Sequence, residues 1–124
     1  MHKVLTIVCC FIILAGCKKN EPVGIEIRAE NSTNVAIDSV QLMYDNSQYN
    51  YGTVQPGDTT GYHFYETLID ATATTFVLDG HQILAGGILP PNPPYPHLSD
   101  GKYILRIFAD SLFPTGYNAE FIKE

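Results

Sequence analysis

Tryptophan is absent from this 124-residue chain, and cysteine is scarce, with three residues in all. Two of them, Cys9 and Cys10, lie in an apolar run near the N-terminus, and the third is Cys17. Residues 18–124 therefore contain no thiol and cannot form a disulfide. A domain built from this part of the chain has to be held together by hydrophobic burial alone.

Basic residues are also few, with seven Lys and Arg against thirteen Asp and Glu. The acidic residues are scattered along the chain, which is typical of a solvated surface, and the only basic pair is Lys18–Lys19. Nucleic-acid binding depends on clustered Lys and Arg side chains that neutralise phosphates. We therefore expect no nucleic-acid partner.

The N-terminal apolar run is too short to cross a membrane. It covers eleven residues, Val4 to Leu14, and would reach about 16 Å as a helix, against a hydrocarbon core of roughly 30 Å. Lys3 precedes the run, and the small residues Ala15 and Gly16 follow it, as in a secretory signal peptide. Residues 1–16 are therefore predicted to be a signal peptide that cleavage removes.

The end of this segment, Leu14-Ala15-Gly16-Cys17, closely resembles the lipobox of bacterial lipoproteins. The resemblance implies that Cys17 becomes the new N-terminus, receives a diacylglyceryl thioether and gains an amide-linked acyl chain. Several acyl chains hold a protein on a bilayer far more firmly than one chain does. We expect residues 17–22 to be the lipidated cysteine and a short tether. The expected location is the cell envelope at the outer membrane, with its periplasmic and surface faces both open.

The remaining residues, 23–124, have the period-two alternation of half-buried strands. Val23, Ile25, Ile27 and Ala29, for example, alternate with residues of the opposite face. The expected strands cover residues 23–29, 35–44, 49–54, 60–65, 71–78, 81–85, 102–109 and 117–122. Seven or eight short strands without a helical stretch predict one all-β domain, an immunoglobulin-like (fibronectin/prealbumin-like) β-sandwich.

Local turn chemistry adds five expectations. Gln55 to Asp58 contains Pro-Gly at its centre and predicts a type II turn, and Asp79-Gly80 between two strands predicts a tight hairpin. Glu30 to Asn34 is a turn cluster. A change of alternation phase near Asp38-Ser39 predicts a β-bulge. Gly86 to His97 holds five prolines, so it is expected to be an extended surface loop.

Leu98 to Tyr103 resembles the tyrosine corner of immunoglobulin-like sandwiches, in which the phenol bonds to backbone a few residues upstream. We therefore interpret Tyr103 as structural. Together with residues 51–62 and the Asp79-Gly80 hairpin, this segment resembles small lipoproteins of the Bacteroidota. Those proteins have a lipobox, one β-sandwich of about this size and no established activity, so the resemblance implies no catalytic residues.

The sequence offers no catalytic set. A G-x-S-x-G nucleophile motif is missing, and the aspartates mostly lie at predicted turns. His63, His81 and His97 lie in separate segments, so a metal site would require the fold to bring them within about 6 Å of one another. We expect a protein that is not an enzyme and has neither cofactor nor metal.

Eight tyrosines are the one compositional excess. Such rings serve either as contact groups for proteins and sugars or as half-buried fillers on a sheet. If a binding surface exists, its candidates are Tyr49 and Tyr51 together with Tyr95 and His97, which lie in the proline-rich loop. The expected function is a binding or structural module with a protein or glycan partner in the envelope.

Two alternatives stay open. One is an accessory glycan-binding lipoprotein of a polysaccharide-uptake system, and the other is a metal-handling periplasmic domain. The identity of the ligand and the oligomeric state do not follow from the sequence.

Overall fold

The structure is a computed structural model that describes residues 23–43, 49–86 and 94–124. The predicted signal peptide, Cys17, the tether and most of the proline-rich loop lie outside these residues. The described residues form seven strands: β1 (Ile25–Asn31), β2 (Asp38–Leu42), β3 (His63–Tyr65), β4 (Thr74–Leu78), β5 (His81–Ala85), β6 (Gly101–Ala109) and β7 (Tyr117–Lys123). Among the same residues, no helix is long and apolar enough to cross a bilayer.

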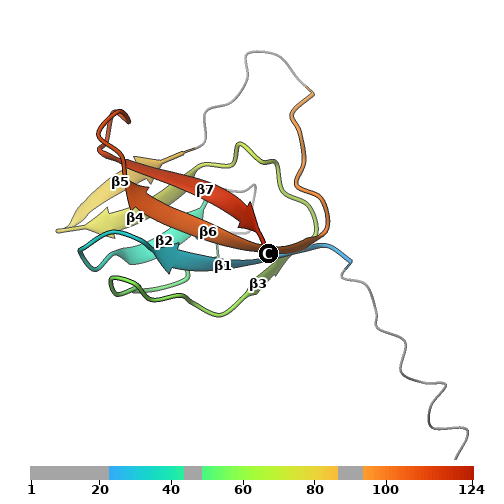
Figure 1. Cartoon of the computed structure of the whole chain (residues 1–124), viewed down its shortest axis with the longest axis horizontal. Coiled ribbons are helices and arrows are strands. Elements are labelled where there is room, and N and C mark those ends of the chain that lie inside the picture. The colour runs from blue at the N-terminus through green and yellow to red at the C-terminus, as the bar shows by residue number, and fades with distance from the viewer. Residues whose placement is uncertain (1–22, 44–48, 87–93) are drawn as a thin grey trace, which may run out of the picture.

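The strands form two sheets, one with the order β3-β1-β6-β7 and one with the order β2-β4-β5 (Figure 1). In the larger sheet β1 pairs antiparallel with β3 and parallel with β6, and β7 adds antiparallel to β6. The smaller sheet is antiparallel throughout. The prediction of an all-β chain with two sheets in a sandwich-like arrangement is confirmed.

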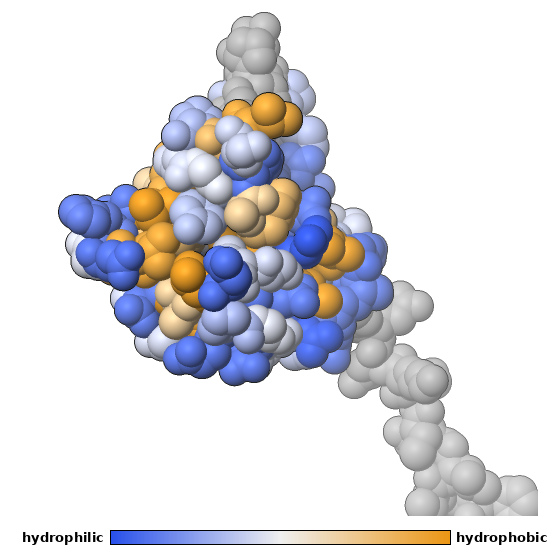
Figure 2. All heavy atoms as spheres, turned by 60° about the vertical axis from the view of Figure 1, so that its left-hand side comes forward, coloured by the Kyte–Doolittle hydropathy of each residue, from blue (hydrophilic) through white to orange (hydrophobic). Residues whose placement is uncertain are grey.

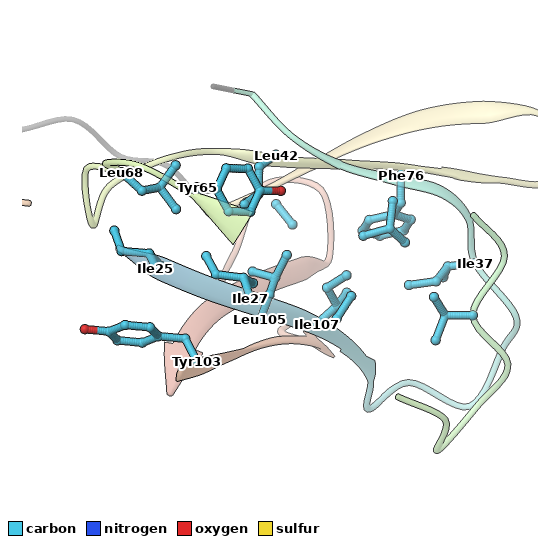
Figure 3. Close-up of a cluster of buried hydrophobic side chains, with 14 residues drawn as sticks. Ile25, Ile27, Ile37, Leu42, Tyr65, Leu68, Phe76, Tyr103, Leu105 and Ile107 are labelled. Atoms are coloured by element: carbon cyan, nitrogen blue, oxygen red, sulfur yellow. The ribbon is translucent and has the colours of Figure 1, made fainter. Parts of the chain in front are cut away.

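The core lies between the sheets, and alternate residues of β1, β2 and β6 contribute much of it (Figure 3). Every second residue of β1 and β6 is buried, as the alternation predicted. The side chains that fill this layer include Ile25, Ile27, Ala29, Ile37, Leu42, Phe76, Leu105 and Ile107. Val23 was expected to share the buried face, but it is 83% exposed. That expectation is wrong because pairing of β1 begins only at Ile25, so Val23 precedes the sheet.

Two predicted turns are confirmed by their backbone geometry. The Asp58 amide donates a hydrogen bond to the Gln55 carbonyl at 3.0 Å, and Gly57 takes the positive φ of +81° that a type II turn requires. In the hairpin between β4 and β5, Asp79 and Gly80 have φ values of +51° and +78°. Positive φ at both central positions is the type I′ geometry, which matches the twist of the two strands.

The predicted bulge in β2 is also present. Ser39 has a φ of +51°, and the pairing register with β4 shifts between Asp38 and Gln41. Residues 49–54 were expected to be a full strand. They meet β2 and the residue before it through two isolated bridges, one on either side of the bulge, and through two backbone hydrogen bonds to Val40. The bulge interrupts the ladder, and the neighbouring segment is therefore not a regular strand.

The connection after β1 depends on one buried amide. Glu30 and Asn31 belong to β1, so the predicted turn cluster starts later than expected. Asn31 is 0% exposed, and its Nδ2 donates to the carbonyls of Val35 at 2.7 Å and Val54 at 2.9 Å. Its Oδ1 accepts from the amide and the hydroxyl of Thr33. Asn31 thus ties the turn and the 49–54 segment to the end of β1.

The tyrosine corner has the predicted geometry. The Tyr103 hydroxyl donates to the Ser99 carbonyl at 2.7 Å, and the side chain is buried. Lys123 approaches the same corner from β7, with its ammonium 5.8 Å from the ring centroid and 2.9 Å from the Ser99 hydroxyl. Tyr103 therefore fixes the entry into β6.

One side of the sandwich is closed where β5 and β7 meet. The Thr115 hydroxyl donates to the Leu84 carbonyl at 2.8 Å. Just after β5, a Cβ on Gly86 would lie 3.0 Å from the Ala119 carbonyl oxygen, so the two backbones approach closely there. Glycine at this position, with φ +67°, permits that approach.

Candidate functional site

Four aromatic side chains gather at the opposite side of the sandwich, where β3 and the 49–54 segment meet. We call Tyr49, Tyr51, His63 and Tyr65 the aromatic edge cluster. The rings of Tyr49 and His63 are stacked, with centroids 3.7 Å apart and an interplanar angle of 6°. Because His63 belongs to the larger sheet and the segment of Tyr49 accompanies the smaller one, the stack joins the two sheets.

Tyr51 and Tyr65 support the stack edge-on. The ring of Tyr51 lies 4.9 Å from that of Tyr49, and the ring of Tyr65 lies 4.9 Å from that of His63, both nearly perpendicular. The Tyr51 hydroxyl donates to the Ile27 carbonyl at 2.9 Å and lies 3.2 Å from the Tyr65 hydroxyl. Since a phenol has one proton, Tyr51 acts as acceptor in that second contact. The supporting rings are thus fixed to β1.

Burial favours the uncharged forms of three members of the cluster. Burial raises the pKa of the Tyr51 phenol far above its ordinary value, and burial also raises the pKa of Tyr65. Burial lowers the pKa of His63, which favours the uncharged ring. Tyr49 remains 40% exposed and forms the open face of the stack. Such a surface can stack on a flat apolar group or on the C–H face of a sugar, and its hydroxyl can hydrogen-bond.

The four predicted surface residues fall into two separate groups. Tyr49 and Tyr51 lie together in the cluster, whereas Tyr95 and His97 belong to a segment that pairs with residues 67–70. His97 Nδ1 lies 3.1 Å from the Thr67 hydroxyl. Among the described residues, no hydrogen bond or ring contact links the two groups. The involvement of any of the four in binding stays a prediction.

The predicted binding surface included neither Tyr65 nor His63, and of these two His63 was considered only as a metal ligand. Its neighbours Tyr62, Phe64 and Tyr65 are all aromatic, which was a local signal of an aromatic surface. Its stacking partner Tyr49 lies fourteen residues earlier, so the pair is formed only when the two sheets assemble. No sequence period predicts such a contact.

The three histidines of the described residues have separate surroundings. His63 stacks on Tyr49, His97 contacts Thr67, and His81 is exposed at the start of β5. In the described ranges, no group of three or more His, Cys, Asp or Glu side chains is placed to hold a metal ion.

Exposed apolar side chains are dispersed on the face that carries the β4–β5 hairpin. Figure 2 shows them as small separate groups among hydrophilic residues. The most exposed is Leu112, at 93%, in the turn between β6 and β7. This face therefore lacks the broad apolar patch that is typical of an obligate interface.

The chain matched no protein-family model, no curated protein and no solved structure. Its function therefore has to be inferred from its own residues.

Proposed function

We propose that this chain is a lipid-anchored, non-catalytic binding module of the cell envelope, and that the aromatic edge cluster contacts its partner. The observation that carries the proposal is the exposed Tyr49–His63 stack on its fixed Tyr51–Tyr65 base. Aromatic side chains that are already held in place lose little conformational entropy when a partner binds. The exposed ring and hydroxyl of Tyr49 suit either a protein or a glycan partner.

The lipobox supports attachment to a membrane. With Cys17 acylated, residues 17–22 would reach at most about 20 Å, even when fully extended. The described chain enters the sandwich at the end where the C-terminus also lies (Figure 1). The domain would therefore stay close to the outer membrane, whichever face of that membrane carries it.

The fold type that we propose is immunoglobulin-like. The hydrogen bond from Tyr103 to the Ser99 carbonyl supports it, because this corner recurs in sandwiches of that type. Domains of this kind serve as rigid supports for binding surfaces, in keeping with a role that needs no catalytic residues.

Photochemical crosslinking in living cells tests the binding surface. A photoreactive phenylalanine derivative placed at position 49 should form a discrete adduct with a protein or glycan of the envelope. The same derivative at position 112, which is exposed in the β6–β7 turn, is the matched control and should form none. An identical adduct pattern at both positions, or no adduct at position 49, would contradict the proposal.

A further inference from the structure

A second candidate site lies between the sheets, away from the aromatic edge cluster. A cavity of about 400 Å³ opens between the start of β4 and the middle of β7, and it shares no lining residue with the cluster. Its volume falls within the roughly 300–1,000 Å³ of small-molecule sites. A binding site here would therefore be additional to the surface proposed above.

The cavity exists because a small residue stands where the core needs volume. Ala119 lies on the inward face of β7 between Tyr117 and Phe121. Tyr117 packs edge-on against Phe76 with centroids 5.5 Å apart, so the layer is filled on that side. Next to it, Ala119, Phe121 and Leu105 leave an apolar wall facing open space.

One of the lining residues carries a buried hydroxyl without a partner among the described residues. Thr74 lines the cavity, is 1% exposed and has the same strand parity as Phe76, which faces the core. Its Oγ1 has no hydrogen-bond partner within the described ranges. Buried hydroxyls are nearly always paired, because leaving one unpaired costs free energy. A change of χ1 between staggered positions would turn the hydroxyl toward an occupant.

The rest of the lining indicates which chemistry would fit. Asp70 and Glu120 contribute exposed carboxylates, and that of Glu120 is already paired with Arg106 at 2.9 Å. The Thr72 hydroxyl, which already donates to the Ile69 carbonyl, has lone pairs left to accept. No Lys, Arg or His is among the lining residues. The site therefore offers acceptors and an apolar wall, and it disfavours an anion.

We propose that this cavity binds a small uncharged ring bearing several hydroxyl groups, such as a single sugar unit. Ring hydroxyls would donate to Asp70 and pair with Thr74. The C–H face of the ring would pack against Phe121 and Leu105. A neutral polyol ring can donate hydrogen bonds to these acceptors and pack its C–H face against the aromatic wall at the same time.

Titration followed by NMR tests the site on the full-length chain in a detergent without sugar groups. The probes are glucose, mannose, N-acetylglucosamine and myo-inositol, with glucosamine as the cationic and glucuronate as the anionic comparison. At least one neutral probe should shift the amide signals of residues 72–74 and 119–121. Thr74→Val should weaken that binding about five-fold through loss of one hydrogen bond. Ala119→Leu should abolish it by filling the space.

Thr59→Val is the matched control, because Thr59 is exposed and lies outside the cavity, and it should leave binding unchanged. If Ala119→Leu fails to fold, Thr74→Val still decides. Three outcomes would overturn the proposal: no shift with any neutral probe, binding of glucosamine alone, or unchanged binding in Thr74→Val. Shifts confined to Tyr49 and His63 would also overturn it, while leaving the proposed function of the aromatic edge cluster intact.

Discussion

Replacing Asn31 with Asp should strongly destabilise the fold, although the two side chains have nearly the same size. The substitution exchanges the donating Nδ2 for an oxygen. The carbonyls of Val35 and Val54 then lose the Nδ2 donor and face an acceptor at a buried side chain. The Val54 carbonyl keeps the Ile37 amide as a donor at 3.1 Å, and the Thr33 hydroxyl lies 2.9 Å from the Val35 carbonyl. The two bonds that Oδ1 accepts from Thr33 can persist.

The size of the effect follows from these contacts. Two lost hydrogen bonds contribute about 1 kcal/mol each, and burying a new acceptor oxygen against two carbonyl oxygens adds about 1 kcal/mol or more. The total of about 3 kcal/mol is a large part of the roughly 5–15 kcal/mol that stabilises a domain. For a domain of this length it corresponds to a fall in Tm of roughly 12–24 °C.

Thermal unfolding followed by circular dichroism measures this difference. Burial would raise the pKa of the new carboxyl group, so its protonated form, which can donate one bond, is favoured as the pH falls. The loss of stability caused by Asn31→Asp should therefore be largest at neutral pH and smaller near about pH 4. Asn34→Asp, exposed in the same turn, is the control and should change stability by less than about 0.5 kcal/mol. If Asn31→Asp melts within a few degrees of that control, the buried-amide reasoning is wrong.

Three further predictions concern single side chains. Tyr103→Phe removes the hydrogen bond to the Ser99 carbonyl and should lower the free energy of unfolding, measured by chemical denaturation, by about 1 kcal/mol. An unchanged denaturation midpoint would contradict a structural role for this hydrogen bond. Thr74→Val removes an unpaired buried hydroxyl and should raise the free energy of unfolding by about 1 kcal/mol. A decrease of that size would instead show that the hydroxyl has a hydrogen-bond partner. Because burial lowers the pKa of His63, its contribution to stability should be complete above about pH 6.5 and decline below it. His63→Gln should therefore reduce the fall in Tm between pH 7 and pH 5, whereas His81→Gln, at an exposed position, should not. If both variants show the same dependence of Tm on pH, the pH effect does not come from His63.

Local features of this fold could be predicted from the sequence because neighbouring residues determine them. The Asp79-Gly80 hairpin and the type II turn each require particular φ values that only a few residue types adopt readily. The alternation in β1 and β6 reports which face is buried, since successive side chains point to opposite sides.

Features that depend on distant partners could not be predicted. Asn31 looked like a turn residue, and its burial follows from contact with Val54, twenty-three residues later. The parallel pairing of β1 with β6 joins segments about 76 positions apart, and nothing local encodes that partner. The Tyr49–His63 stack and the cavity beside Ala119 likewise arise only when the two sheets come together.

Intact-mass spectrometry of the mature protein, extracted from membranes of the producing bacterium, tests the proposed lipid anchor most directly. We predict a chain that begins at Cys17 and carries the added mass of a diacylglyceryl group and an amide-linked acyl chain. A Cys17→Ser variant should lack this added mass and should be absent from the membrane fraction. Recovery of the unmodified chain from the soluble fraction, with Cys17 as a free thiol, would contradict a membrane-anchored module.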